Sequence, residues 1–201
     1  FYALILFSTM GMMVMATTTD LVVMFLGLEI MSVPLYVLAG FAPHSAQSNE
    51  AGVKYFIMGA FATAFLLLGI AFVYGAAKST DLRVLVTDFA YLEARSGGFL
   101  YAGIGLILIG FGFKVAAVPF HAWVPDVYQG APTPVTAFFS VGPKAAGIAV
   151  MLRIFIFGFG TLPSLSTIFW VLAVLTMTVG NIMAVRQDNV KRMLAYSSIA
   201  H

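Results

Sequence analysis

The chain has 201 residues, of which 61% are hydrophobic and 9% are charged, with a formal net charge of +2 and no cysteine. Soluble domains are about 45–50% apolar and about 25% charged, so this composition excludes a soluble globular fold. The small net charge gives no indication of nucleic-acid binding. The lack of cysteine excludes disulfides, thiolate metal sites and cysteine-ligated iron–sulfur clusters among these residues.

Seven apolar stretches follow one another along the chain, and most are near the roughly 20 residues that a membrane-spanning helix needs. They cover residues 1–16, 21–41, 49–75, 99–118, 135–159 and 164–185, and the last begins near residue 190. A polar segment, residues 78–98, separates the third from the fourth. We therefore expect an all-α integral membrane protein, a multi-helix bundle in which residues 1–201 form a single membrane domain. Because both chain ends lie in helix-like runs, we expect a fragment of a longer protein.

Basic residues suggest how the bundle is oriented. Arg186, Lys191 and Arg192 lie in a short polar segment that only Asp188 opposes. Since positively charged short loops stay on the cytoplasmic side, this loop is expected to face the cytoplasm or the mitochondrial matrix. The loop at residues 43–48 is expected on the same side.

Four ionisable residues fall inside the apolar stretches: Glu29, Lys54, Lys114 and Lys144. Glu29 follows Asp20 by nine positions, or about 13.5 Å of helix, which places it near the middle of a hydrocarbon core about 30 Å thick. Burying such a charge costs about 2.5–3.5 kcal/mol on the insertion scale, so the four residues indicate a functional polar site. We expect Glu29 to lie within reach of Lys114 or Lys54, directly or through one water.

Simpler interpretations exist for each of these charges. Lys54 lies close enough to a helix end to extend its ammonium group to the interface. Lys144 follows Gly142-Pro143, where a helix irregularity can admit water. Glu29 and Lys114 can form an ion pair that only holds helices together.

Four prolines between residues 119 and 134 predict an interrupted helix. Pro119 removes one backbone hydrogen bond and its ring clashes with the carbonyl at position 115. Within a membrane the freed backbone groups must be satisfied by protein or water. We therefore expect a broken transmembrane helix near Lys114–His121, with a polar cavity beside Lys114. His121 lies on the same face as Lys114 if helicity resumes, although a histidine that merely satisfies a helix end fits equally well.

Residues 112–126 (GFKVAAVPFHAWVPD) resemble the signature of the proton-translocating antiporter-like subunits of respiratory complex I, NADH:quinone oxidoreductase. The continuation, residues 127–138 (VYQGAPTPVTAF), is similar to the subunit N branch, the equivalent of mitochondrial subunit 2. Residues 27–29, 54–56, 143–144 and 195–201 fit the same pattern.

The resemblance implies an inverted five-helix repeat over about 1–160 and the start of a second repeat over about 161–201. It implies that Glu29 and Lys114 form a glutamate–lysine pair, that Lys144 is a connecting lysine and that Lys54 is a further membrane lysine. His121 and His201 are possible members of the proton path.

The resemblance also implies that this chain holds no cofactor, since NADH, FMN, iron–sulfur clusters and quinone are bound by other subunits of the complex. The implied partners are other membrane subunits of complex I, especially the antiporter-like ones, and lipids. The implied location is a bacterial plasma membrane or a mitochondrial inner membrane. Two alternatives stay open: a subunit of a multisubunit sodium/proton antiporter, and a structural scaffold whose buried charges only lock helices together.

Overall fold

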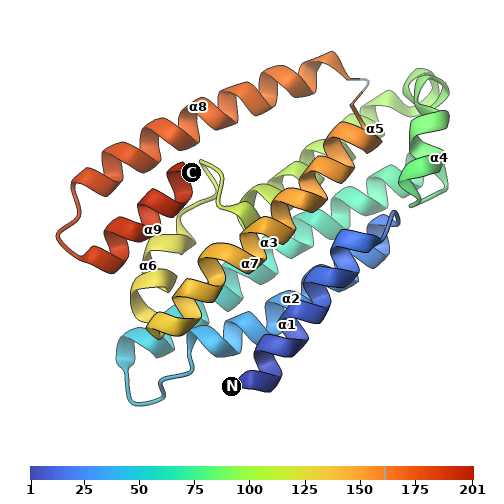
Figure 1. The fold of residues 1–201 in the computed structure, drawn as a ribbon. Coiled ribbons are helices and arrows are strands. Elements are labelled where there is room, and N and C mark those ends of the chain that lie inside the picture. The colour runs from blue at the N-terminus through green and yellow to red at the C-terminus, as the bar shows by residue number, and fades with distance from the viewer. Residues whose placement is uncertain (161) are drawn as a thin grey trace.

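Helical segments make up nearly all of the residues that the computed structural model describes, which are residues 1–160 and 162–201 (Figure 1). The helices are α1 (Tyr2–Thr17), α2 (Leu21–Ala39), α3 (Ala46–Ala77), α4 (Leu82–Thr87), α5 (Phe89–Val115), α6 (Trp123–Gly130), α7 (Thr133–Met151), α8 (Pro163–Val185) and α9 (Val190–Ala200). A π-helical segment, η1 (Leu152–Gly158), continues α7. The described part of the chain has no β-sheet, which agrees with the predicted fold class.

Five helices in the described residues are long and apolar enough to cross a membrane. They are α2, α3, α5, the joined α7 and η1 over Thr133–Gly158, and the Ser164–Val185 part of α8. The apolar α1 has 16 residues and α9 has 11, both shorter than a full span. The division into seven spans and two repeats therefore stays a prediction.

The helix starts follow local capping chemistry. The carboxylate of Asp20 accepts hydrogen bonds from the amides of Val22 and Val23, which satisfies two of the free N–H groups at the start of α2. The hydroxyl of Ser45 accepts from the amide of Ser48 at the start of α3. These short polar side chains set where each apolar run begins.

The polar segment between residues 78 and 98, which separates the third and fourth apolar stretches, is largely helical. It contains α4 and the first turns of α5, so the fourth long helix begins at Phe89 rather than at Phe99. A kink at Ser96 (φ −143°, ψ 29°) divides the polar part of α5 from its apolar part. A helix satisfies its own backbone groups in water as in lipid, so hydropathy marks where the chain enters the membrane and not where the helix starts.

Small residues allow the closest helix contacts. Gly69 of α3 and Gly103 of α5 face each other, and a Cβ atom added to Gly69 would lie 2.8 Å from the Gly103 carbonyl oxygen. Gly11 of α1 and Gly27 of α2 meet in the same way. Such contacts are a common means of helix association in lipid, where lipid tails are as apolar as the side chains.

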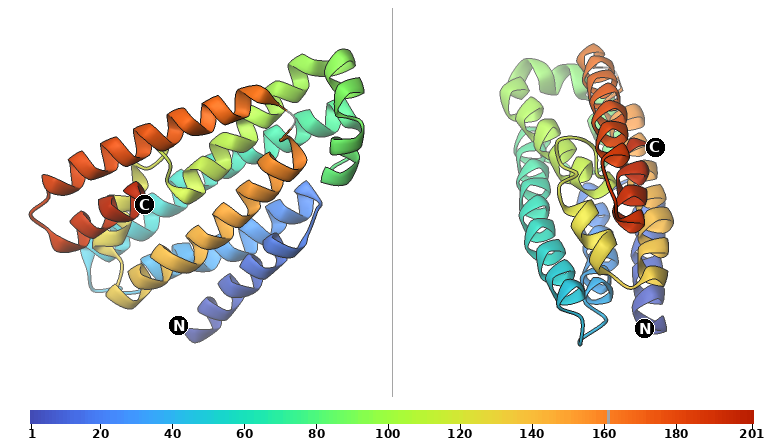
Figure 2. Two further views of the ribbon diagram at one scale, coloured as in Figure 1. Left: turned by 45° about the horizontal axis from the view of Figure 1, so that its top comes forward. Right: turned by 90° about the vertical axis from the view of Figure 1, so that its left-hand side faces the viewer.

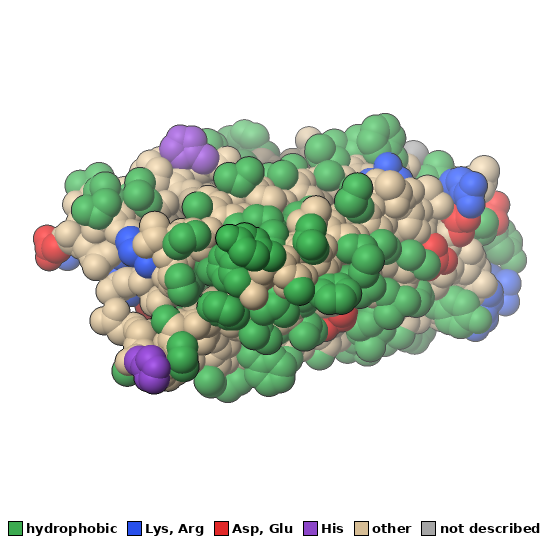
Figure 3. All heavy atoms as spheres, turned by 60° about the horizontal axis from the view of Figure 1, so that its bottom comes forward, with side chains coloured by type: hydrophobic (Ala, Val, Ile, Leu, Met, Phe, Trp, Pro, Cys, Tyr) green, Lys and Arg blue, Asp and Glu red, His purple; other side chains and the backbone are tan. Residues whose placement is uncertain are grey.

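The helix α8 lies at the periphery of the bundle and packs mainly on α9 (Figure 2). Only 6% of its most apolar window is buried, against 56% for α2. The space-filling view shows hydrophobic side chains across the middle of one face and most charged side chains near its two ends (Figure 3). This distribution is the one expected of a bundle that crosses a bilayer.

Candidate functional site

The predicted break in the fourth long helix is confirmed. Helix α5 ends at Val115 and α6 begins at Trp123, with turns between them. Ala116 ends α5 in the left-handed region at φ 65°, a conformation that residues other than glycine rarely adopt. The amide of Ala117 donates to the Gly112 carbonyl over 2.9 Å, which satisfies one of the carbonyls that the helix leaves free.

The side chain of Trp123 bridges the two halves of the broken helix. Its indole N–H donates to the carbonyl oxygen of Phe113 over 2.9 Å. Its ring stacks on the ring of Tyr55 with centroids 4.4 Å apart and an interplanar angle of 7°. Within the break itself, the amide of Val118 donates to Oγ1 of Thr176 in α8 over 3.0 Å. The freed backbone groups thus find partners in the protein, as a break at membrane depth requires.

Lys114 is buried at the end of α5, with 5% of its surface exposed. Its Nζ donates to Oγ of Ser32 over 2.7 Å and to the hydroxyl of Tyr55 over 3.4 Å. The same nitrogen lies 5.6 Å from the centroid of the Tyr55 ring, within range of a cation–π interaction. Both hydrogen-bond partners are neutral, so no carboxylate holds the lysine directly.

A cavity of about 10 Å³ lies beside this lysine. Ser32, Tyr36, Thr63 and Lys114 contribute polar groups to its wall. A volume of about 10–15 Å³ is the minimum for one water. A cavity with some polar groups in its wall therefore lies next to Lys114, and its volume is at the lower limit for a single water.

A direct ion pair between Glu29 and a lysine is not formed. None of the salt bridges among the described residues, which have nitrogen–oxygen distances within 4.0 Å, involves Glu29. Its Oε1 is buried and has no hydrogen-bond partner among the residues that the structure describes. Ser32, one turn after Glu29, takes the position next to the lysine. The arrangement through one water stays a prediction.

Lys54 belongs to a different cluster, at the end of the bundle. Its Nζ lies 2.8 Å from Oδ2 of Asp126 and 2.6 Å from Oε1 of Glu50. Arg192 contacts the other oxygen of Asp126 over 2.6 Å, so one carboxylate joins α3, α6 and α9. Burial raises the pKa of Asp126, but the hydrogen bonds from Lys54 and Arg192 together lower it by more. The resulting pKa lies below the ordinary value. The side chain of Lys54 is 42% exposed, which agrees with an interfacial lysine.

Lys144 of α7 contacts α9. Its Nζ donates to Oγ of Ser198 over 2.7 Å and also to the Ser198 carbonyl oxygen. Gly147, one turn further along α7, lies against the stem of Lys114, because a Cβ added there would be 3.8 Å from Cγ of the lysine. Lys114 therefore packs on α7 within one turn of Lys144, because residues 144 and 147 share a helical face.

The two histidines occupy different surroundings. His121 lies in the turns before α6. Helicity has not resumed at this residue, so the condition for a helical face shared with Lys114 is not met. The Nδ1 of His121 is buried and has no hydrogen-bond partner in the described part of the chain. His201 is exposed, and its Nδ1 lies 2.9 Å from the Ser197 carbonyl oxygen.

Sequence reasoning missed several polar contacts of the site. Ser32, Tyr55, Asp126 and Ser198 hold the lysines. The three hydroxyl residues cost too little in a hydropathy profile to stand out, and Asp126 lies outside the apolar stretches. A signal existed for Ser32, which lies three positions after Glu29 and so shares its helical face. For Asp126 and Ser198 the partners come from distant helices, which no local pattern indicates.

These features define a multi-pass membrane protein with buried ionisable side chains next to an interrupted helix. Residues 18–201 match the family model for NADH:quinone oxidoreductase/Mrp antiporter transmembrane proteins. The chain belongs to this family.

Named relatives and solved structures agree with this assignment. NADH-quinone oxidoreductase subunit N of Trichlorobacter lovleyi is 57% identical over the whole chain, which spans 41% of that relative. Respiratory complex I from Thermus thermophilus superposes over the whole chain and 42% of the matched chain, with a TM-score of 0.84 and 42% identity. The Mrp complex from a Dietzia species superposes over 98% of this chain and 36% of that chain, with a TM-score of 0.84 and 26% identity. The chain thus spans about two fifths of the length of the relatives it matches.

Proposed function

We propose that this chain is part of the proton-translocating subunit N of a bacterial NADH:quinone oxidoreductase in the plasma membrane. The observation that carries the proposal is Lys114: a buried amine, held by neutral hydroxyls, at the break of a transmembrane helix. An ionisable group in this setting is costly unless it has a role in moving charge.

The choice of complex I over a sodium/proton antiporter rests on similarity. The identity to the complex I structure is 42%, against 26% to the Mrp structure, although the TM-scores are equal. The relatives at 51% and 57% identity are both named NADH-quinone oxidoreductase subunit N. The fold is common to both kinds of complex, so the transported ion must be tested directly.

In the proposed mechanism Lys114 binds a proton that arrives through water and later releases it towards Lys144. Glu29 supplies the control, because its carboxylate attracts the ammonium form of Lys114 without contacting it. At an effective dielectric constant near 20, the attraction between opposite charges grows from roughly 2 kcal/mol at about 8 Å to roughly 4 kcal/mol at about 4 Å. A change of about 2 kcal/mol alters a proton-binding equilibrium by roughly thirtyfold.

This change alone does not drive transport. Moving one charge against about 150 mV costs about 3.5 kcal/mol, which exceeds the gain from a single rearrangement. Further coupling between buried charges has to supply the rest. We propose that the energy comes from quinone reduction in other subunits, which also bind NADH, FMN and the iron–sulfur clusters. Neighbouring antiporter-like membrane subunits are the proposed partners.

Two substitutions of Lys114 in the full-length subunit test the proposal. Lys114→Met keeps a flexible apolar stem of similar length and removes the titratable group. Lys114→Arg keeps the charge but cannot release its proton, since its pKa stays above about 12. We expect both variants to assemble, both to lose proton pumping and both to slow quinone reduction. The measurements are proton translocation in reconstituted vesicles and the yield of assembled complex.

The alternatives predict other results. A scaffold role for Lys114 predicts that arginine is tolerated while methionine lowers assembly, because the partner charge Glu29 is stranded. A sodium antiporter predicts transport that stops when sodium is replaced by potassium. Full pumping by Lys114→Met would refute the proton-carrying role.

A further inference from the structure

Helix α6, the second half of the broken helix, lies between α3 and α9 (Figure 2). It has eight residues, whereas isolated helices shorter than about 12–15 residues are marginal in water, so α6 depends on its neighbours for its position. Trp123 and Asp126 are three positions apart in it and share one helical face. The contacts of these two side chains therefore decide where α6 lies.

Two adjacent residues of α3 make those contacts. The Nζ of Lys54 donates to Oδ2 of Asp126 over 2.8 Å. The next residue, Tyr55, stacks its ring on the ring of Trp123 with centroids 4.4 Å apart. Both aromatic side chains are buried, whereas the side chain of Lys54 is 42% exposed. An ion pair near the surface and an aromatic stack in the interior thus connect the same two helices.

The aromatic stack continues to the buried lysine. Nζ of Lys114 donates to the hydroxyl of Tyr55 over 3.4 Å, which is one of its two hydrogen bonds to side-chain hydroxyls. Ordinary hydrogen bonds have donor–acceptor distances of about 2.7–3.2 Å, so this one is already long. A small outward shift of Tyr55 would break it. The position of Tyr55, which Trp123 supports, therefore affects the surroundings of Lys114.

Asp126 uses its two carboxylate oxygens on two different helices. Oδ2 pairs with Lys54 of α3, and Oδ1 accepts from Arg192 of α9 over 2.6 Å. Each cation has a second partner: Lys54 pairs with Glu50 of its own helix over 2.6 Å, and Arg192 donates to Oε1 of Gln129 over 3.2 Å. Of the two carboxylates that pair with Lys54 in the described residues, only Asp126 belongs to another helix.

We propose that Asp126 is a positioning residue for proton transfer at Lys114. It holds α6 on α3, so that Trp123 keeps the Tyr55 hydroxyl beside the lysine. The proposal rests on the proposed proton-translocating function and adds no further proton carrier to it. Asp126 acts through Trp123 and Tyr55, and it neither gives nor takes the transported proton.

Asp126→Asn separates this role from a general contribution of charge. Asparagine has one acceptor oxygen, and its amide nitrogen only donates, so it cannot serve two cations. Lys54 still has the carboxylate of Glu50, whereas Arg192 has only a neutral amide, so we expect the oxygen to stay with Arg192 and the link to α3 to be lost. The matched control Glu50→Gln removes the other carboxylate from Lys54 but keeps that link. Asp126→Glu keeps two acceptor oxygens and should restore it.

The first measurement follows the position of Trp123 in the purified full-length subunit. The 201 residues contain two tryptophans, so Trp170→Phe, with replacement of any tryptophan elsewhere in the full-length chain, makes Trp123 the fluorescent reporter. Trp123 is 3% exposed, and acrylamide should quench it slowly. Asp126→Asn should raise the quenching rate by roughly two- to fivefold, the factor that corresponds to about 0.4–1 kcal/mol for a partly exposed ion pair. Glu50→Gln and Asp126→Glu should leave the rate unchanged.

The second measurement is proton pumping per assembled complex in reconstituted vesicles. Tyr55→Phe removes the hydroxyl and keeps the stacked ring. If Asp126 acts through that hydroxyl, Asp126→Asn and Tyr55→Phe should each lower pumping, and the double variant should pump no less than the weaker of the two single variants. A contribution to stability alone predicts otherwise: either the two losses multiply, or only the yield of complex falls while pumping per complex stays unchanged.

The outcomes separate this proposal from the proposed function. Equal quenching of Trp123 in Asp126→Asn and Glu50→Gln would overturn the positioning role, and so would multiplied losses in the double variant or full pumping by Asp126→Asn. Failure of the proposed function instead shows as full pumping by Lys114→Met, whatever the quenching of Trp123.

Discussion

The contact between α3 and α5 gives the sharpest stability prediction, because it depends on backbone atoms. A Cβ added to Gly69 would lie 2.8 Å from the Gly103 carbonyl oxygen and 2.8 Å from the Ile107 amide nitrogen. Ordinary van der Waals contact begins near 3.4 Å, so Gly69→Ala requires the two helices to separate by about 0.6 Å. Backbone atoms cannot rotate away as a flexible side chain can.

Gly105 of α5 is the matched control. A Cβ added there meets nothing within 4 Å. Replacing a helical glycine by alanine gains about 0.8–1 kcal/mol through helix propensity, so Gly105→Ala should be stabilising by up to that amount. Overpacking costs about 1–3 kcal/mol, so Gly69→Ala should be neutral to destabilising by about 2 kcal/mol after the same gain.

The assay is unfolding of the purified full-length subunit in mixed micelles with increasing SDS, followed by loss of helical signal. The quantity compared is the difference between the two variants, expected at about 1–3 kcal/mol, because the propensity term then cancels. Equal stability of Gly69→Ala and Gly105→Ala would refute the view that backbone contact sets the distance between α3 and α5.

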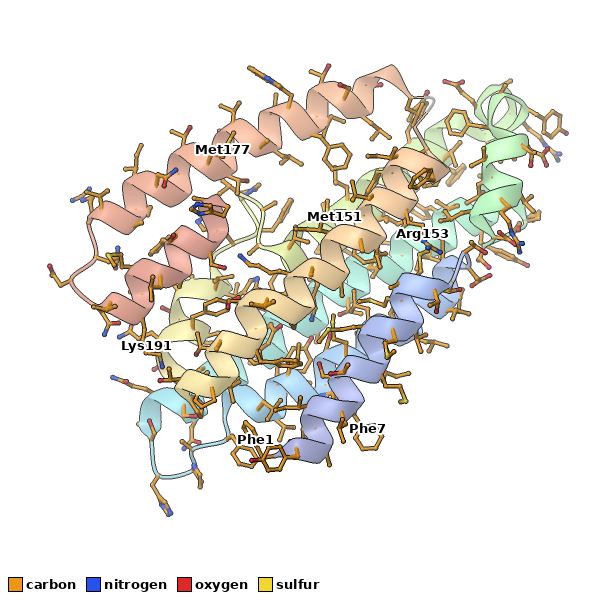
Figure 4. The ribbon with its side chains drawn as sticks, in the orientation of Figure 1. Phe1, Phe7, Met151, Arg153, Met177 and Lys191 are labelled. Atoms are coloured by element: carbon orange, nitrogen blue, oxygen red, sulfur yellow. The ribbon has the colours of Figure 1, made fainter. Side chains whose placement is uncertain are left out.

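Two further predictions concern polar contacts at the helix ends. Asp126→Asn should destabilise the protein by about 1 kcal/mol at neutral pH. The value is small because the side chains of Asp126 and its two basic partners are about a third or more exposed. The control Asp188→Asn should have little effect, since Asp188 is exposed and has no ion pair in the described residues. Because the pKa of Asp126 is depressed, its contribution to the free energy of unfolding should be complete above about pH 4 and should disappear as the pH falls through the depressed pKa. SDS unfolding across this range should therefore show a smaller loss of stability in acid for Asp126→Asn than for the unchanged protein. Arg153 donates to the Thr17 and Thr18 carbonyl oxygens at the end of α1 over 3.3 and 3.0 Å (Figure 4), so Arg153→Met should cost about 1 kcal/mol in the same assay. The exposed Arg186→Met serves as its control, and equal stability of these two variants would contradict a capping role for Arg153.

Local sequence patterns were enough to predict the bilayer location and the break. Apolar runs of near-spanning length have few alternatives to helices, because every backbone group in lipid must be satisfied within its own segment. Pro119 predicted the interruption by the same argument, and α5 indeed ends before it at Val115. In the polar segment before residue 99 the solvent no longer forces this answer, and the predicted start of the fourth stretch at residue 99 was wrong, because α5 begins at Phe89.

The presence of costly charges was also a property of the sequence, since a lysine in an apolar run requires partners wherever the chain folds. Which partners they are was decided by the tertiary structure. The Ser32 hydroxyl that receives the Lys114 hydrogen bond lies 82 positions away in the chain, and the Asp126 carboxylate that pairs with Lys54 lies 72 positions away. Charge favours Glu29 as the partner of Lys114, but helix rotation and packing place Ser32 and Tyr55 at contact distance instead. Hydrogen bonds act over about 3 Å, so they depend on the positions of individual helix faces, which hydropathy and periodicity do not specify.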